Sequence, residues 1–217
     1  MNWEFIFKHS PLFIDATLLT LKISFFGILG AMILGLLIGL ILYYKIFGLQ
    51  FVAKIYLSFS RNTPLLIHLF FLYYGLGQLD FKISAYHCAI IGVIFLGGSY
   101  IAESFMLGFE SVSRIQSESA TALGFSKSQT FYHIVLPQSL GISLPSLGAN
   151  VIFLLKETSV VSAIALADVV FVTKDLIATY SRTTEALFML VVVYLILLLP
   201  LSLLFTWLEN FYKKKIL

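Results

Sequence analysis

The sequence predicts an all-α integral membrane protein with about five transmembrane helices. Of its 217 residues, 59% are hydrophobic and only 12% are charged, whereas about 25% of the residues of an average soluble domain are charged. Water cannot solvate such a surface, so we expect one domain that lies in a bilayer. The apolar residues also gather in long runs without charge, each near the roughly 20 residues that a helix needs to cross a bilayer core of about 30 Å.

These runs predict the boundaries of the spans. A membrane domain over 17–206 is expected between an N-terminal extracytoplasmic segment, 1–16, and a basic cytoplasmic tail, 207–217. The connection 110–136 is one of only two long polar intervals between the apolar runs. The predicted spans cover about 18–44, 62–79, 83–103, 144–165 and 186–208.

Lysine and arginine predict the orientation, because cytoplasmic loops of membrane proteins carry an excess of these residues. Seven basic residues fall on one side of the predicted topology and four on the other. This difference places the N-terminus outside the cell and the C-terminus in the cytoplasm. The cytoplasmic set is Lys45, Lys54, Arg114, Lys127, Lys213, Lys214 and Lys215, and the external set is Lys8, Lys82, Lys174 and Arg182.

The first span carries a small residue at every fourth position: Gly27, Ala31, Gly35 and Gly39. Small residues at this spacing form a ridge that lets two helix backbones approach closely in lipid. The ridge predicts a packing face, either within this chain or toward a partner.

The polar interval 110–136 contains the signals of a short helix. Ser113 and Gln116 have the spacing of a capping box, and Glu118 adds negative charge near the start of the helix. Gly124 is expected to end it, since glycine adopts the left-handed conformation after a last turn at little cost. The interval therefore predicts a helix of two to three turns that is held out from the membrane as a docking element.

A second helix is expected to begin directly after this element. Ser126 and Gln129 repeat the capping-box spacing. Pro137 is expected to interrupt this helix, because proline removes a helical hydrogen bond. The fourth span would then start near Leu144.

Two charged residues, Lys156 and Glu157, fall inside that span. They lie about 12 residues, or about 18 Å, from its expected start. A charge at such depth costs at least about 2.5 kcal/mol unless it faces a polar cavity or a partner. In the alternative interpretation the helix ends at Leu155 and both side chains are solvated. The other charges near span ends, Arg61 and Glu103, can mark the membrane interface.

Several enzyme motifs are absent from the sequence. It has no G-x-x-x-x-G-K-S/T phosphate loop, so ATP chemistry cannot be placed in this chain. It also has no H-E-x-x-H, C-x-x-C or G-x-S-x-G motif. We expect no catalytic residues, no metal site and no cofactor.

Three ordered motifs give the sequence a family resemblance. Glu118-Ser119-Ala120, followed by Leu123-Gly124 and Ile134-Val135-Leu136-Pro137, resembles the EAA loop of permeases of importer-type ATP-binding cassette (ABC) transporters, with Ser119 in place of the middle alanine. Arg61-Asn62-Thr63-Pro64-Leu65-Leu66 and Lys156-Glu157-Thr158-Ser159 are similar to R-G-T-P-L-L and K-D-T-S of the polar amino-acid permeases. The resemblance covers about Thr17 to Phe205.

This resemblance implies a type I ABC importer permease fold with a cytoplasmic coupling helix, in the inner membrane of a bacterium. It implies a polar amino acid as cargo, with an ATPase dimer, a second permease subunit (identical or homologous), a solute-binding protein and membrane lipid as partners, and no nucleic acid. The ATPase-coupling residues would be Glu118, Ser119, Ala120, Leu123 and Gly124, and the substrate-pathway residues Arg61, Thr63, Lys156, Glu157, Thr158 and Ser159.

Three other classes of membrane protein fit the sequence less well than a permease. A membrane-embedded enzyme requires a cluster of ionisable residues, and the carboxylates here are scattered. An ion channel fits five spans but gives no reason for a capped cytoplasmic helix that ends at Gly124. A non-transporting scaffold fits the composition but not the pair Lys156-Glu157 within a span.

Overall fold

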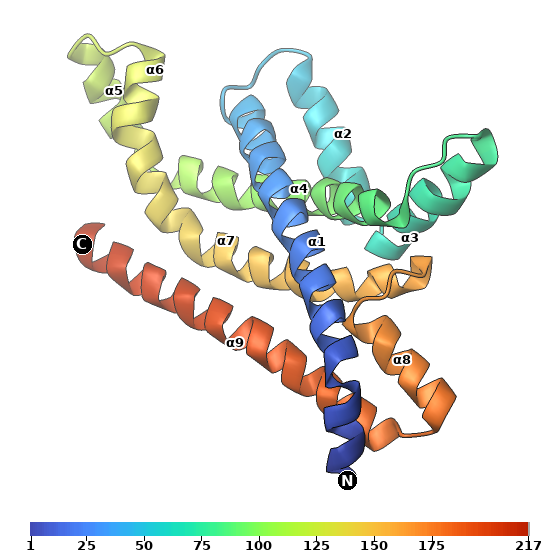
Figure 1. The fold of residues 1–217 in the computed structure, drawn as a ribbon. Helices are drawn as coiled ribbons and strands as arrows, with labels where there is room; N and C mark the ends of the chain where they lie inside the picture. Colours follow the sequence, from blue (N-terminus) through green and yellow to red (C-terminus); the bar gives the residue numbers. More distant parts are fainter. Residues whose placement is uncertain (217) are drawn as a thin grey trace.

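The computed structural model describes residues 1–216, and they form a bundle of helices without strands (Figure 1). Within residues 1–216, four helical segments are long and apolar enough to cross a membrane: α1 (Trp3–Tyr43), α4 (Ala85–Ser111), the continuous segment Lys127–Ile164, and Thr183–Tyr212 of α9 (Thr183–Ile216). The all-α membrane prediction is confirmed. The other elements are α2 (Leu49–Arg61), α3 (Leu65–Phe70), a π turn (Phe71–Gly75), a 3-10 turn (Leu76–Leu79), α5 (Arg114–Ala122) and α8 (Val169–Tyr180).

The helices that contain the first and third predicted spans extend beyond the predicted bounds. Helix α1 begins at Trp3 and not near residue 18, so most of the predicted segment 1–16 is helical, and α4 continues past residue 103 to Ser111. A charge-free run measures only the apolar part of a helix. Backbone hydrogen bonds continue through charged residues such as Lys8 and Asp15, which lie within α1.

The second predicted span, 62–79, is one half of a broken helix. Its apolar part, Leu65–Leu79, has 15 residues and, at about 1.5 Å per residue, is shorter than a bilayer core of about 30 Å. Helix α2 precedes it and ends at Arg61. The break has a local cause, because Pro64 disfavours the helical conformation of the residue before it.

The predicted interruption at Pro137 is wrong. The chain is helical from Lys127 to Ile164, through α6 (Lys127–Thr130), a π turn (Phe131–Val135), α7 (Leu136–Glu157) and a 3-10 segment (Thr158–Ile164). A π turn, which is wider than an α-helical turn, directly precedes the proline. The helix can therefore continue although Pro137 has no N–H to donate. The alternative in which this helix ends at Leu155 is wrong as well.

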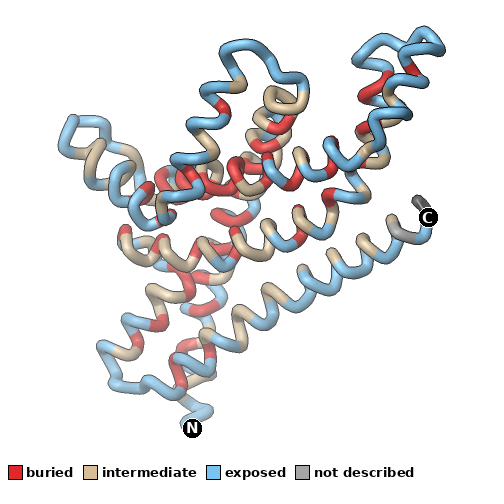
Figure 2. The backbone as a smooth tube through the Cα atoms, turned by 180° about the vertical axis from the view of Figure 1, so that it is seen from behind, coloured by how far each residue is buried: buried red, intermediate tan, exposed pale blue. Residues whose placement is uncertain are grey.

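The ridge of small residues packs against α4 within the same chain. A methyl group placed on Gly27 would lie 2.6 Å from Val93 Cγ1, and one on Gly35 would lie 2.9 Å from the backbone nitrogen of Ala102. The two helices therefore touch backbone to side chain, as expected for small residues at a membrane-helix interface. Buried residues gather at this crossing, whereas most of α9 remains exposed with an apolar surface that suits lipid (Figure 2).

Candidate functional site: a projecting helix and a polar pocket

Helix α5 (Arg114–Ala122) lies at one extreme of the molecule, where it projects with α6 beyond the bundle (Figure 1). Its nine residues make about two and a half turns, as the sequence predicted. Two apolar side chains at its ends are open, since Ile115 is 72% exposed and Leu123 is 79% exposed. A short rigid element that presents apolar side chains is suited to dock in a groove of another protein.

Gly124 ends α5 as predicted, with a φ of +86° in the left-handed region. The Phe125 N–H donates to the Ala120 carbonyl at 3.0 Å, and the Gly124 N–H donates to the Thr121 carbonyl at 3.0 Å. These two bonds form a Schellman motif, which satisfies the last carbonyls of the helix. The end of α5 is therefore defined by local chemistry.

The beginning of α5 differs from the prediction. Ser113 occupies the N-cap position but its side chain makes no capping bond, and the Gln116 side chain accepts a bond from Gln138 Nε2 at 2.7 Å instead. Gln116 thus joins α5 to the long helix, because a longer-range partner competes with the local cap. The second predicted box is confirmed: the Gln129 N–H donates to Ser126 Oγ at 3.3 Å, and the Ser126 N–H donates to Gln129 Oε1 at 2.8 Å.

The predicted coupling residues divide between two faces of α5. Ser119 and Leu123 are exposed, and the exposed Glu118 pairs with Arg114 one turn earlier at 3.0 Å. Ala120 is only 2% exposed and is covered by its own chain. Its small size lets α5 fold back onto the long helix.

A separate group of polar residues lies where α2 meets α4. The Arg61 guanidinium forms an ion pair with the Glu103 carboxylate, and its central carbon lies 5.2 Å from the centre of the Tyr100 ring. These side chains line a pocket of about 410 Å³. The remaining lining residues are Leu57, Ser58 and Asn62.

The break between α2 and α3 positions this pocket. Asn62 Nδ2 donates to the Ser58 carbonyl at 2.7 Å, and Thr63 Oγ1 donates to the Phe59 carbonyl at 2.9 Å. Both side chains therefore satisfy the last carbonyls of α2, and no side chain caps the start of α3. With those groups satisfied, Arg61 at the end of α2 points to α4.

Glu103 lies well inside its helix. It follows the start of α4 by 18 residues, or about 27 Å, and precedes Ser111 by eight residues, or about 12 Å. An unpaired carboxylate in such a position is costly, and Arg61 pairs with it. This pair was not predicted from the sequence, because Glu103 was placed at the end of a span. The helix continues beyond Glu103, and a charged residue inside a helix is a signal that it needs a partner.

The remaining predicted pathway residues lie on the other side of the break, at the end of α7. Lys156 is exposed, Glu157 and Ser159 are half-buried, and Thr158 is buried with its hydroxyl donating to the Leu155 carbonyl at 2.7 Å. The 3-10 segment that follows Glu157 contacts α3 and α4. The structure therefore brings Arg61 together with Glu103, whereas Lys156 to Ser159 lie outside the lining of that pocket.

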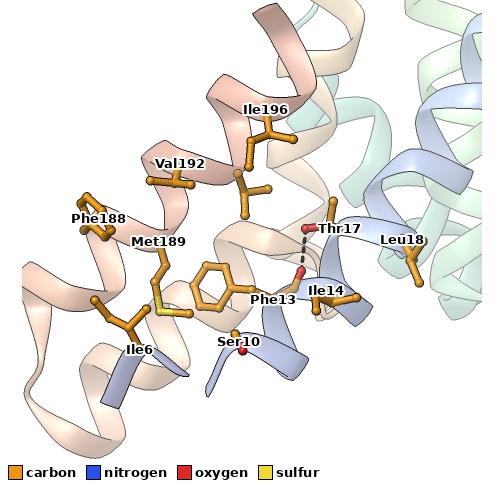
Figure 3. Close-up of a pocket in the computed structure, with 11 residues that line it drawn as sticks. Ile6, Ser10, Phe13, Ile14, Thr17, Leu18, Phe188, Met189, Val192 and Ile196 are labelled. Atoms are coloured by element: carbon orange, nitrogen blue, oxygen red, sulfur yellow. Dashed lines mark hydrogen bonds between the residues drawn. The ribbon is translucent and has the colours of Figure 1, made fainter. Parts of the chain in front are cut away.

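Two other cavities lack free charges. The cleft of about 340 Å³ between α1 and α9 is apolar, and its Thr17 hydroxyl donates to the Phe13 carbonyl at 2.5 Å (Figure 3). A pocket of about 330 Å³ beside α3 contains His68, which is 8% exposed and packs edge-on against Phe95 at 5.1 Å. Within the described residues, no group of three or more His, Cys, Asp or Glu side chains could hold a metal ion.

Comparisons with known proteins agree with this architecture. The Glutamine transport system permease protein GlnP of Escherichia coli (strain K12) is 31% identical over 214 residues, 96% of each chain. The probable amino-acid permease protein YxeN of Bacillus subtilis (strain 168) is 38% identical over 162 residues, 73% of this chain and 72% of the relative.

A solved structure described as an amino acid ABC transporter with histidines superimposes with a TM-score of 0.89 at 29% identity, covering 97% of this chain and 98% of that one. The family model of the binding-protein-dependent transport system inner membrane component matches residues 31–216. Its match spans most of the chain. The protein therefore belongs to the family of inner membrane components of binding-protein-dependent transport systems.

Proposed function

We propose that this chain is the permease subunit of an ATP-driven importer for polar amino acids, and that it forms the translocation path and couples to a separate ATPase. Relatives named for the transport of glutamine, of L-cystine and of amino acids in general support the cargo class. The absence of a phosphate loop from the sequence is consistent with a separate ATPase chain. The proposed assembly contains an ATPase dimer, a second permease subunit and a solute-binding protein.

The observation that carries the coupling proposal is the projecting helix α5. It is rigid at its end, through the Schellman motif at Gly124, and it is tied to the long helix by the bond between Gln138 and Gln116. A movement of the ATPase against Leu123 and Ile115 would therefore reach the spanning helices without being lost in a flexible loop. Such transmission is what alternating access requires, since ATP binding must bias the permease between two states.

A surface substitution tests this proposal without changing the fold of α5. Leu123→Asp places a charge where an apolar side chain is 79% exposed. We expect it to weaken retention of the ATPase and to lower amino-acid uptake at least about tenfold, as loss of an apolar interface anchor does. ATPase activity and uptake are measured on the same reconstituted sample.

Leu79→Asp is the matched control, since Leu79 is 65% exposed and lies far from α5 in the sequence, at the end of the apolar segment Leu65–Leu79. It should retain the ATPase. Wild-type uptake and ATPase retention in Leu123→Asp would refute the coupling role. Absence of uptake of every amino acid tested with the wild-type complex would refute the cargo class.

A further inference from the structure

The turn between α1 and α2 exposes both aromatic and basic side chains. Phe47 is 96% exposed, the highest value among the large apolar side chains that the structure describes, and Phe51 is 68% exposed. Lys45 and Lys54, on either side of these aromatic residues, are exposed as well. Lys45 and Gly48 have positive φ values of 50° and 76°, which reverse the chain within a few residues. The fold therefore presents these side chains on a defined turn.

The place of the turn in the fold indicates where it meets the membrane. The spanning helix α1 ends at Tyr43, with Tyr44 at its C-cap, and tyrosine is enriched at the boundary between a membrane and water. Helix α2 then runs back along α4, since the Tyr56 hydroxyl donates to the Phe95 carbonyl at 2.7 Å within that spanning helix. The turn lies at one end of the molecule, away from the N-terminus (Figure 1). A chain that leaves one spanning helix and returns along another reverses among the lipid headgroups.

The protein does not neutralise the two lysines of the turn. No aspartate or glutamate occurs between Asp15 and Asp80 in the sequence. Among the described residues, neither Lys45 nor Lys54 forms a salt bridge. Lysines next to a membrane attract the phosphate groups of anionic lipids. The charge of the turn is therefore complementary to a negatively charged membrane surface.

We infer that residues 44–54 form a binding site for an anionic phospholipid. Lys45 and Lys54 attract its headgroup, while Phe47 and Phe51 enter the boundary between headgroups and acyl chains, as aromatic side chains of interfacial segments do. This inference goes beyond the proposed function, because it requires neither a particular cargo nor an ATPase.

A lipid fits this surface better than free phosphate does. A phosphate ion would pair with the lysines but leave Phe47 in water, where exposure of an apolar ring is unfavourable. A lysine beside an aromatic ring suits a boundary that is polar on one side and apolar on the other. There the lysine stem packs against apolar groups while its ammonium group reaches the headgroups.

The test uses the purified protein in lipid nanodiscs, with the subunits that co-purify with it, so that surfaces covered in the complex stay covered. The nanodiscs contain equal amounts of phosphatidylglycerol and phosphatidylcholine, and each lipid in turn carries a photoactivatable group near its headgroup. Mass spectrometry quantifies the cross-linked peptides. We expect peptides that contain residues 44–54 to capture phosphatidylglycerol at least about fivefold more than phosphatidylcholine, because each lysine near an anionic surface contributes a factor of roughly five.

The variants identify the groups that select the lipid. Lys45→Gln combined with Lys54→Gln should reduce the capture ratio to near one. Lys8→Gln combined with Lys82→Gln removes two other exposed lysines and is the charge-matched control, which should keep the wild-type ratio. Phe47→Ser should lower capture of both lipids at the turn several-fold, because the turn loses its apolar contact. High salt should lower the ratio in wild type, since salt screens exposed charges.

The outcomes separate this inference from its alternatives and from the proposed function. A ratio near one in wild type, or an unchanged ratio in the double variant of Lys45 and Lys54, would overturn the site. Capture of neither lipid at residues 44–54 would show that a protein partner covers the turn and would overturn it as well. Loss of selectivity in millimolar inorganic phosphate at matched ionic strength would assign the lysines to the free ion instead. Lack of amino-acid uptake by the wild type would refute the proposed function and leave this inference standing.

Discussion

Gln138 on α7 donates its side-chain N–H to Gln116 Oε1 on α5 at 2.7 Å, across 22 residues of sequence. Gln138 also donates to the Ile134 carbonyl of its own helix at 3.0 Å, which orients its amide. The bond between Gln138 and Gln116 directly connects α5 with the membrane-spanning segment Lys127–Ile164. A movement of α5 would therefore reach that segment through this bond.

We predict that Gln138→Leu loosens this tie. The substitution keeps the size and helical propensity of the side chain but removes a bond worth about 1 kcal/mol. The ratio of ATP hydrolysed to amino acid imported should rise a few-fold, while ATPase retention stays near wild type. The measurement is that ratio in proteoliposomes. Gln78→Leu, at an exposed position outside α5, serves as the control, and an unchanged ratio in Gln138→Leu would count against a role for this bond.

Packing at the ridge leads to a second prediction. Gly35→Ala would place a methyl group 2.5 Å from Ile101 Cγ2 and 2.9 Å from the Ala102 backbone nitrogen. Because a backbone atom cannot move aside, α1 must shift from α4, which costs about 1–3 kcal/mol. Melting of the purified protein in detergent should occur at a lower temperature. Gly77→Ala, whose methyl group would meet nothing within 4 Å, should melt as wild type does.

Asp168 leads to a prediction about pH. It is fully buried at the N-cap of α8, where one carboxylate oxygen accepts from the Phe171 N–H at 2.8 Å. Burial raises the pKa of Asp168 from 3.8 to about 6, although the amide donors and Lys174 oppose the shift. The folded protein therefore holds this proton more tightly than the unfolded chain does.

The resulting stabilisation is present below about pH 4 and is lost as pH rises through about 6. A shift of about two pKa units corresponds to about 3 kcal/mol. Asp168→Asn keeps an N-cap side chain but cannot ionise. Its melting temperature should vary less between about pH 4 and pH 7 than that of wild type. Asp175→Asn, at an exposed position of the same helix, should retain the wild-type profile; a flat wild-type profile would exclude this role of Asp168.

Glu157 is the subject of a transport prediction. It is half-buried, late in the long segment Lys127–Ile164, where a carboxylate is costly unless it meets a polar group. We predict that Glu157→Gln lowers uptake at least about tenfold while the complex still assembles. An uptake assay measures transport, and size-exclusion chromatography of the same preparation measures assembly of the complex. Asp15→Asn, on the exposed face of α1, is the control, and wild-type uptake by Glu157→Gln would remove Glu157 from the pathway.

The proposed orientation can be tested with single cysteines in a Cys88→Ser background. The lysine and arginine asymmetry predicts that a cysteine at Lys127 reacts with an impermeant maleimide only from the cytoplasm, and one at Lys174 only from outside. Both side chains are exposed in the structure. Labelling of position 174 only from the cytoplasmic side would contradict the proposed topology, because its orientation or its number of spans would have to differ.

The sequence by itself determined those features whose physical causes are local. The membrane class follows from composition, the end of α5 at Gly124 follows from the conformational freedom of glycine, and the box formed by Ser126 and Gln129 depends on residues three apart. The ridge on α1 was also visible, because helical periodicity places its four small residues on one face. Each of these signals lies within a few turns of chain.

Tertiary structure decided which distant groups meet. It placed α4 against the ridge, brought Gln138 to Gln116, and joined Arg61 to Glu103 across 42 residues of sequence. It also let the long helix pass through Pro137 by means of a π turn. These outcomes depend on the free energy of packing and of pairing charges inside a membrane, which no local pattern contains, because the partner of each group is chosen only when the helices assemble.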